Sequence, residues 1–338
     1  MKKKLNITLL VDQGAYPDSL IPNNGYKNNQ STEHHIIQAL NKLGHTINIV
    51  GVDYNVDTIV KEINFNRPDL VFNLTEQFRN NRMLDKNIAA LLEMLDIPFT
   101  GTGPVGLTLC RNKALCKQIL NSRKIQVPRF IVLPQNKKIR IPKSFKYPLI
   151  VKPLLEDGSE GISNASLVKN QKALEERAKL VHENWNEAAI AEEFIEGREL
   201  YVSILGNKRL TVFPPRELHF NNCEPGHPVM ATYRVKWNPE FRKHWDIQFN
   251  YAHIEKNLEI KINRICKKVY RLLQIKDYGR IDIRITNNNQ IYILEANPNP
   301  DLAYGDELAL SAMKTGLSYE ELINKIFHLT LSRFSSIS

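Results

Sequence analysis

The first 110 residues alternate between short apolar runs and stretches with helical periodicity, and this alternation limits the fold more than any other feature. Three apolar runs predict strands, at 5–11, 46–50 and 69–74, and a helix is expected at 33–43, ended by Gly44. We expect Asp85 to cap a second helix, because apolar residues follow it at the i, i+3, i+4, i+7 spacing, at Ile88, Leu91, Leu92 and Leu95. Alternating strands and helices predict a parallel, doubly wound α/β domain.

The pattern changes after residues 100–104, which read Thr-Gly-Thr-Gly-Pro. Beyond them we expect strands at 129–133, 149–153, 190–194 and 200–205, helices at 112–120, 171–182, 258–272 and 319–331, a loop-like region at 214–250, and a hairpin after 279. A chain of 338 residues is too long for one ordinary core. We therefore predict an N-terminal Rossmann-like domain (1–110), a central unit (111–206) and a C-terminal unit (207–338).

Composition excludes several classes of protein. With 42% hydrophobic and 24% charged residues the chain is a folded globular protein, and no run approaches the ~20 apolar residues of a membrane span. A basic start precedes the first apolar run, but Asp12 ends that run and no cleavage site follows, which favours a strand and a cytoplasmic protein over a secretion signal. Cysteines 110, 116, 223 and 266 lack C-x-x-C spacing and are expected to be free thiols.

The net charge of +10 would permit a nucleic-acid partner. However, the lysines and arginines are scattered along the chain and are not interleaved with aromatic residues. A site for anionic small molecules needs only a few of these cations, so a nucleic-acid partner is not favoured.

The predicted hairpin carries the first chemical signal. Isoleucines 281, 283 and 285 alternate with Asp282 and Arg284, which gives the strand one apolar and one charged face. If the loop has two residues, Asp282 lies across from Ile293 and diagonal to Glu295, with Asn297 on the same face; a three-residue loop would separate the carboxylates. Two carboxylates and an amide oxygen suit Mg²⁺, although an ordinary solvated hairpin face would contain the same residues.

Two further segments have the composition of a phosphate and nucleotide site. The apolar strand 147–153 delivers Lys152 at its end, and the glycines and serines of 156–163 would let backbone N–H groups approach phosphate oxygens. A turn between two strands would look similar. In the strand–turn–strand segment 191–200, Glu192 and the Ile195 backbone could hold a base, and Glu199 could accept the hydroxyls of a ribose.

Together these motifs resemble the ATP-grasp enzymes and, among them, the D-alanine–D-alanine ligase family. Lys113 near a helix start, Lys152, the segment 192–200 and the pair Gly279-Arg280-Ile281-Asp282 and Leu294-Glu295-Ala296-Asn297-Pro298 occur in this order in the family. Residues 91–103 and 112–117 are also similar. The likeness covers roughly 69–330 and implies an α/β ATP-grasp fold preceded by a doubly wound pre-ATP-grasp domain.

The resemblance also implies roles for individual residues. Lys113 and Lys152 would hold the phosphates of ATP, with Gly158 and Ser159 closing over them. The segment Glu192, Glu193, Phe194 and Ile195 would face adenine, and Glu199 would bind the ribose. Asp282, Glu295 and Asn297 would bind Mg²⁺, for which Mn²⁺ could substitute. Arg280 would stabilise the transferring phosphoryl group, and Lys236, in a segment like the family's mobile loop, would reach the γ-phosphate.

The sequence departs from the family where amino-acid substrates would bind. An Asn-rich insert precedes Glu33, which could hold a substrate ammonium group or only complement a helix dipole. The family's Gly-rich loop is reduced to 73–78, without glycine, and the segment 298–307 contains Asp301, Asp306 and Glu307. Such a pocket could prefer a cationic amine, or these carboxylates could simply face water.

We therefore predict an ADP-forming ATP-grasp ligase that joins a carboxylate to an amine through an acyl phosphate. Its partners would be amino acids or small peptides, and the chain could form a homodimer. One alternative is D-alanine–D-alanine ligase itself, against which the altered substrate segments argue. The other is an ATP-binding module that has lost its chemistry.

Overall fold

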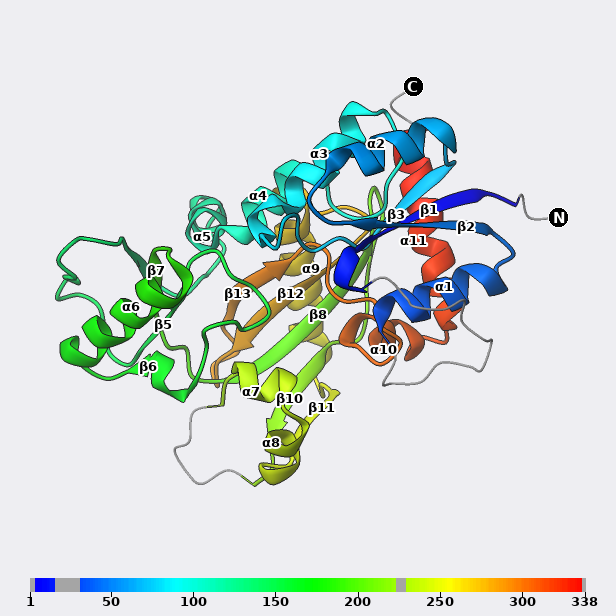
Figure 1. The fold of residues 1–338 in the computed structure, drawn as a ribbon. Coiled ribbons are helices and arrows are strands. Elements are labelled where there is room, and N and C mark those ends of the chain that lie inside the picture. The colour runs from blue at the N-terminus through cyan, green and yellow to red at the C-terminus, as the bar shows by residue number, and fades with distance from the viewer. Residues whose placement is uncertain (1–3, 16–30, 223–228, 336–338) are drawn as a thin grey trace.

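The computed structural model describes residues 4–15, 31–222 and 229–335, which form three β-sheets with helices packed around them (Figure 1). The strand orders are β2-β1-β3 in the first sheet, β4-β7-β5-β6 in the second and β11-β10-β8-β12-β13 in the third, where β9 also pairs with β8. Cys223 lies outside the described residues, and the other cysteines are buried free thiols, as predicted: Cys110, Cys116 and Cys266.

The N-terminal sheet is parallel, as the alternation predicted. β1 (Asn6–Asp12) lies between β2 (Thr46–Val52) and β3 (Leu70–Asn73). The helices of this region are α1 (Thr32–Lys42), α2 (Val56–Phe65), α3 (Asp85–Met94) and α4 (Pro104–Arg111). The prediction missed α2, whose inward face is narrow, with Ile59 and Ile63 as its buried residues.

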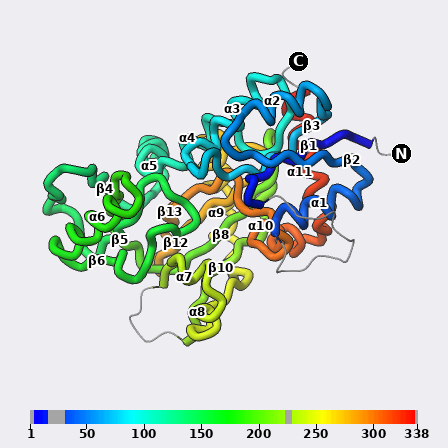
Figure 2. Tube along the Cα trace, in the orientation of Figure 1, coloured from blue at the N-terminus to red at the C-terminus, as the bar shows by residue number. Residues whose placement is uncertain are grey.

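The last helix of the chain belongs to the core of this first sheet. α11 (Tyr319–Phe334) packs against α1, and Figures 1 and 2 show it crossing behind β1 and β2. Leu322, Ile326 and Phe327 of α11 share one apolar cluster with Leu9 and Phe72. The N-terminal core is therefore assembled from both ends of the chain.

The central sheet is antiparallel and consists of β4 (Phe130–Leu133), β5 (Leu149–Pro153), β6 (Leu167–Val168) and β7 (Ala189–Glu193). Helix α6 (Gln171–Trp185) supplies Leu174, Ala178 and Val181 to the core of this sheet. Helix α5 (Lys113–Ser122) lies instead against α9 and the third sheet, so it connects the central unit with the C-terminal one.

The third sheet contains β8 (Arg198–Gly206), β9 (Leu210–Val212), β10 (Arg216–Phe220), β11 (Ile247–Tyr251), β12 (Tyr278–Ile285) and β13 (Ile291–Asn297). Helix α9 (Lys256–Leu272) and the isoleucines of β12 pack together in one core. Because β8 pairs with β10 and β12, sheet pairing would move the predicted boundary at 206 to the segment between β7 and β8. The predicted C-terminal unit also includes α11, which packs into the core of the first sheet.

Three local predictions were wrong. The expected loop at 214–250 contains β10, β11, α7 (Tyr233–Trp237) and α8 (Pro239–His244), because Thr232 and Asn238 cap the two short helices. Helix α10 (Glu307–Met313) was not expected. Asp85 is the first residue of α3 and not its cap, because it already has helical backbone angles, and its buried carboxylate binds Arg111.

The hairpin between β12 and β13 differs from the predicted register. Thr286 N–H donates to Gln290 O, at 3.0 Å, which leaves a three-residue loop, Asn287–Asn289. Alone, that loop would place Asp282 opposite Leu294. A bulge after Asp282 takes up Leu294, so Asp282 faces Glu295 directly. The predicted pairing of Asp282 with Ile293 was therefore wrong, yet the two carboxylates still share a face.

Candidate active site

The charged face of the hairpin brings together the three predicted metal ligands and one predicted catalytic residue, Arg280. Arg280 pairs with Asn297 across the two strands, and Asp282 pairs with Glu295. Residues directly opposite each other on antiparallel strands project from the same face, so all four side chains lie side by side. The opposite face of β12 carries its isoleucines, which are buried in the core.

Asp282 is held by its neighbours on this face. Arg280 donates to both carboxylate oxygens, from Nε at 2.8 Å and from Nη2 at 3.1 Å, and Asn297 Nδ2 donates to Oδ2 at 3.1 Å. Burial opposes the charge of Arg280, but the carboxylates of Asp282 and Glu307 outweigh it and raise the pKa of Arg280. The guanidinium also lies 5.3 Å from the ring centroid of Tyr201, on β8.

Glu295 is surrounded by positive charge. Burial would raise the pKa of its carboxyl group, but Lys113, Lys152, Lys236 and Lys117 together lower that pKa to about 2. Lys113 Nζ lies 3.6 Å from Glu295 Oε1 and also donates to Glu156 O. The lysines predicted to hold phosphates therefore converge on this carboxylate.

A second carboxylate lies between two lysines on the facing central sheet. Glu192 of β7 is 3.2 Å from Lys152 Nζ and 3.4 Å from Lys117 Nζ. Burial opposes its ionisation, but these two ammonium groups lower the pKa of Glu192. Burial lowers the pKa of Lys117 in turn, and Lys117 Nζ donates to Leu294 O at 2.6 Å. Lys117 thus ties the central sheet to the bulge of the hairpin.

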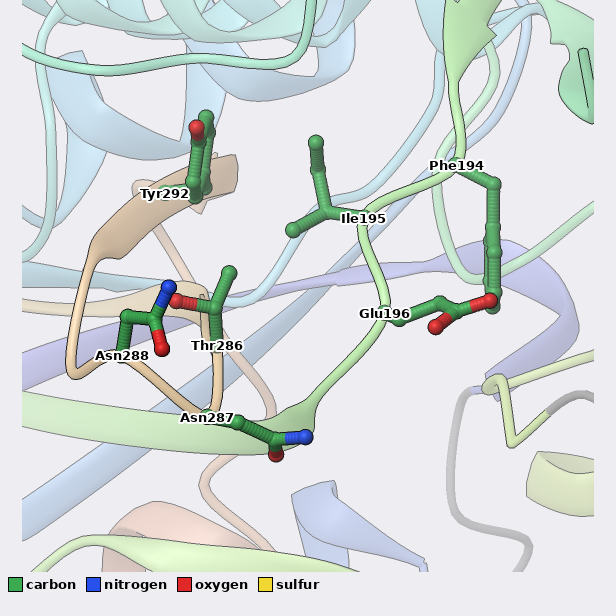
Figure 3. Close-up of a pocket in the computed structure, with 7 residues that line it drawn as sticks. All are labelled: Phe194, Ile195, Glu196, Thr286, Asn287, Asn288 and Tyr292. Carbon is green, nitrogen blue, oxygen red and sulfur yellow. The ribbon is translucent and has the colours of Figure 1, made fainter.

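The segment predicted to hold base and ribose forms the outer end of this face. The segment of Phe194, Ile195 and Glu196 lies across a cavity of about 420 Å³ from the hairpin loop, and Thr286 and Tyr292 of the hairpin also line it. The Ile195 side chain points toward the loop, whereas those of Phe194 and Glu196 lie on the other side of the segment (Figure 3). Glu199 accepts hydrogen bonds from Arg284 and from the Tyr201 hydroxyl group. The side chain of Glu193 turns away from this region, toward Arg129 and the Lys146 N–H group.

The Gly-Ser loop is held from two sides. Ser159 Oγ donates to Ala231 O at 2.8 Å, and Trp237 Nε1 donates to Gly158 O at 3.1 Å, so the loop contacts the segment that carries Lys236. On its other side Asp157 forms ion pairs with Arg82, at 3.2 Å, and with Arg111, at 3.3 Å. The loop therefore bridges the N-terminal and C-terminal parts of the chain. Gly158 has a φ of +61°, which favours glycine there.

Acidic side chains gather at the opposite end of the hairpin face. Glu307 lies 3.6 Å from Arg280, and Asp301 accepts a hydrogen bond from Thr32 of α1, at 2.5 Å. Burial and the adjacent Asp301 raise the pKa of Asp306 well above the ordinary range. Across from them, burial of Asp12 and its proximity to Glu33 raise the pKa of Asp12 to about 6, although N–H groups of the 76–77 segment oppose this.

Sequence reasoning missed three side chains of this site. Lys117 follows Lys113 by four residues on α5 and so projects from the same face of the helix, which was a readable signal. Arg284 was recognised only as part of a charged face. Tyr201 gave no signal, because an aromatic residue in an apolar strand is ordinarily a core residue.

The donor set fits a hard cation bound mainly through a ligand. Within the described ranges no group of three or more His, Cys, Asp and Glu side chains could form a metal cage. Asp282, Glu295 and Asn297 supply only oxygen donors on one face, the pattern of a Mg²⁺ site completed by phosphates and water.

The fold defines the class of protein. Over 99% of the chain it matches the crystal structure of D-alanine–D-alanine ligase from Bacillus anthracis complexed with ATP, with a TM-score of 0.74, 19% identity and 100% coverage of that chain. Over 97% it matches VanG D-Ala:D-Ser ligase from Enterococcus faecalis, with a TM-score of 0.69, 17% identity and 100% coverage. The chain has the ATP-grasp fold, as predicted.

Sequence comparison then gives the family. The model described as D-ala D-ala ligase C-terminus matches residues 119–328, which is more than half of the chain. The chain therefore belongs to the D-Ala–D-Ala ligase family and is an ATP-dependent, ADP-forming ligase. D-alanine–D-alanine ligase from Aquifex aeolicus is 28% identical over 86% of this chain and 91% of its own length, and an uncharacterized protein of Sinorhizobium fredii, y4sG, is 28% identical over 88% and 87%.

None of the helices in the described ranges has the length and apolar character needed to cross a membrane.

Proposed function

We propose that this ligase forms an amide or peptide bond between amino acids or small peptides, by way of an acyl phosphate. The observation that carries the proposal is the concentration of four lysines around Glu295, beside the Arg280–Asp282 pair. Such a cluster neutralises the charge of bound phosphates and of a phosphoryl group in transfer. The names of the D-alanine–D-alanine ligase relatives support amino acids as substrates.

The nucleotide would lie between the central and third sheets. Lys113 and Lys152 would hold its phosphates, with the amides of Gly158 and the hydroxyl group of Ser159 above them. Glu192 and the Ile195 backbone would hold adenine, and Glu199 the ribose. Glu193 and Phe194 would contribute through the backbone and ring of the same segment, because the Glu193 carboxylate binds Arg129 instead.

Mg²⁺ would be held by Asp282, Glu295 and Asn297, with Mn²⁺ as a substitute. When bound, the ion would neutralise charge on the phosphates. Since Arg280 now donates to both oxygens of Asp282, we expect this pair to open as the nucleotide binds. The freed guanidinium would then face the transferring phosphoryl group and, later, the oxyanion of the tetrahedral intermediate.

The chain's own residues would order the two half-reactions. The carboxylate substrate attacks the γ-phosphate and displaces ADP, which forms the acyl phosphate. The amine then attacks the acyl carbon, gives up a proton and expels phosphate. Lys236, which is close enough to Glu295 to lower its pKa, would neutralise the γ-phosphate. The contacts of Ser159 with Ala231 and of Trp237 with Gly158 would exclude water that hydrolyses the acyl phosphate.

D-alanine–D-alanine ligation is a specific candidate within this proposal. It is supported by the name that several relatives of similar length share. Glu33 would hold the ammonium group of the first substrate, since it lies near the junction of α1 with the 298–307 segment. Dimer formation remains a separate proposal.

A substrate screen tests the proposed function. Purified protein with Mg-ATP would be incubated with pools of L- and D-amino acids, dipeptides and polyamines, while ADP and new product masses are measured. We expect ADP release coupled to one amide product, and its loss in Asp282→Ala. The matched control is Glu176→Gln, on the exposed face of α6. ATP binding without turnover in any pool would contradict the proposal and favour a silent nucleotide-binding protein.

A further inference from the structure

A buried arginine occupies the outer end of the nucleotide face, next to the residues proposed to hold base and ribose. Arg284 is 2% exposed and lies on the same face of β12 as Asp282. Nη1 donates to Ile195 O at 2.9 Å, while Nη2 donates to Glu199 and, at 3.0 Å, to Val229 O. Its guanidinium carbon is 5.0 Å from the Phe194 ring centroid.

The ion pair restrains Glu199 from one side, and Tyr201 restrains it from the other. Arg284 donates to Oε2, and the Tyr201 hydroxyl group donates to Oε1 at 3.0 Å. A carboxylate offers about four acceptor sites on its two oxygens, so each oxygen of Glu199 can accept one more hydrogen bond. Two remaining acceptors on a fixed carboxylate match the two vicinal hydroxyl groups of a ribose.

The buried pair of Arg284 and Glu199 is not explained by stability alone. Burying an ion pair is often no more stabilising than packing apolar side chains of similar volume. Within the described residues, Arg284 Nε is also buried without a hydrogen-bond acceptor. An unpaired donor adds to the cost of burying this guanidinium, in a face otherwise built for a nucleotide.

We propose that Arg284 is a positioning residue for the ribose of the nucleotide, acting through Glu199. By fixing one rotamer of the Glu199 carboxylate and by holding the Ile195 carbonyl group, Arg284 aligns the sugar acceptor with the segment that faces the base. The inference rests on the proposed nucleotide site. It assigns a function to a strand position that the predicted metal and phosphate residues leave unexplained.

The test compares nucleotides that differ only in one hydroxyl group. Dissociation constants of Mg-ATP and Mg-2′-deoxy-ATP would be measured by calorimetry for the wild type, Arg284→Met, Arg284→Lys and Tyr201→Phe. A hydrogen bond to a charged group corresponds to roughly tenfold or more in affinity, so the wild type should prefer ATP by about that factor. We expect Arg284→Met to bind both nucleotides with nearly equal affinity, and Arg284→Lys to restore part of the preference.

Arg198→Met is the matched control. Arg198 lies on the same strand as Glu199, but its bidentate ion pair, at 2.7 and 2.6 Å, is with Glu217. This variant should leave the preference for ATP intact. Tyr201→Phe keeps the ring beside Arg280 but removes the second donor to Glu199, so it should also reduce the preference, which keeps the test valid if Arg284→Met does not fold.

Three results would overturn the inference. An equal loss of affinity for both nucleotides in Arg284→Met would assign Arg284 a purely structural function. A wild type that binds both nucleotides equally would show that Glu199 does not receive the sugar hydroxyl group. A wild type that binds no ATP would remove the proposed nucleotide site itself, and this failure is distinct from the other two.

Discussion

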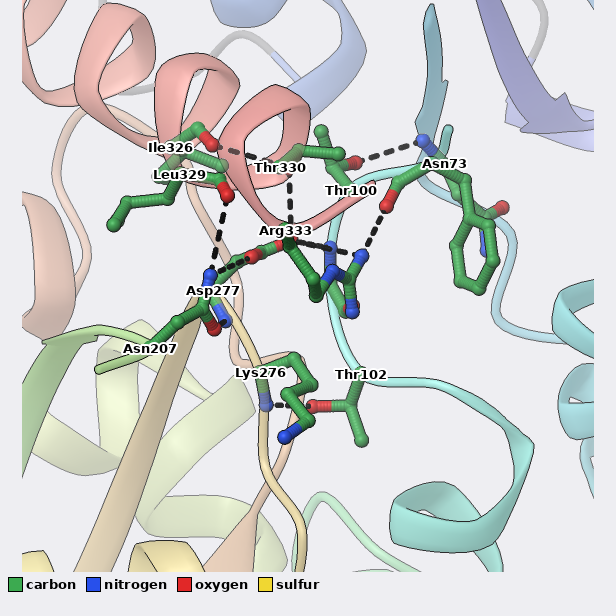
Figure 4. Close-up of polar contacts among 12 residues, drawn as sticks. Asn73, Thr100, Thr102, Asn207, Lys276, Asp277, Ile326, Leu329, Thr330 and Arg333 are labelled. Carbon is green, nitrogen blue, oxygen red and sulfur yellow. Dashed lines mark hydrogen bonds and ion pairs between the residues drawn. The ribbon is translucent and has the colours of Figure 1, made fainter. Parts of the chain in front are cut away.

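Asp277→Asn should destabilise the protein, because the Asp277 carboxylate accepts hydrogen bonds from segments of the chain that are far apart in sequence. This carboxylate lies immediately before β12 and is fully buried. Figure 4 shows its polar contacts with Asn207 and with α11. Oδ2 accepts from the Gly101 N–H group at 2.9 Å and from the Thr330 hydroxyl group at 2.8 Å, and it lies 3.2 Å from Arg333 Nη2. Oδ1 accepts from Asn207 Nδ2 at 2.8 Å.

An asparagine at this position cannot satisfy these donors in either orientation. If its amide nitrogen takes the place of Oδ2, it faces the donors of Gly101 and Thr330. If it takes the place of Oδ1, it faces Asn207 Nδ2. Asn207 cannot rotate its amide freely, because its own oxygen accepts from the Asp277 N–H group at 2.9 Å. The variant therefore loses the charge opposite Arg333 and gains at least one donor–donor contact.

We expect Asp277→Asn to lower the free energy of unfolding by about 3–5 kcal/mol, the usual cost of breaking a buried ion pair. The melting temperature should fall by roughly 6–20 °C, at about 2–4 °C per kcal/mol. Urea denaturation monitored by two independent probes would measure the change and test for intermediates. Thr330→Val, which removes a single donor, should cost only about 1 kcal/mol. A loss below about 1 kcal/mol in Asp277→Asn would refute this reasoning.

Three further outcomes are expected. Lys152→Met should weaken ATP binding by roughly tenfold or more, measured by calorimetry. The substitution removes a cation proposed to hold phosphate and leaves the negative charge of Glu192 less neutralised. Unchanged affinity would exclude Lys152 from the phosphate site. Because the pKa of Glu295 is lowered from 4.5 to about 2 on folding, its stabilising contribution is complete above pH 4.5 and lost as the pH falls toward 2. Between pH 4.5 and 2 the free energy of unfolding of Glu295→Gln should accordingly fall less steeply than that of the wild type. An equal slope in both proteins would contradict a lowered pKa of Glu295. Asp157→Asn should increase protease cleavage within 156–163 severalfold, because both arginine contacts of the loop are weakened; Glu176→Gln, at an exposed pair, should leave cleavage unchanged.

The residue types of the candidate site can be read from the sequence, whereas the register that brings them together cannot. The parallel N-terminal strands, the charged face of β12 and the places of Lys152 and Glu192 on strands follow from local sequence patterns. Lys113 was singled out only by the resemblance to the ATP-grasp family. The hairpin register did not, because two irregularities cancel. The three-residue loop would move Glu295 out of line with Asp282, and the bulge at Leu294 brings it back.

Other features depend on contacts between distant segments, which periodicity does not encode. Strands β10 and β11 lie in a polar segment that reads as loop, and they are ordered by pairing, β10 with β8 and the edge strand β11 with β10. Lys117 meets Glu192 only after the central sheet packs against α5. Arg284 was visible as a charge in the strand, but its partner Glu199 is 85 residues away in the chain.

The helix α11 in the N-terminal core has a consequence for synthesis on the ribosome. Domains ordinarily fold as units while the chain emerges, with the N-terminal one first. Here the apolar surface around Leu9 and Phe72 is completed by Leu322 and Ile326, which are translated long after the first sheet. The first sheet must therefore wait until α11 has been synthesised, with part of its core uncovered until then. Nascent chains of this enzyme should depend on chaperones at that stage, and C-terminal truncations should aggregate through the N-terminal domain.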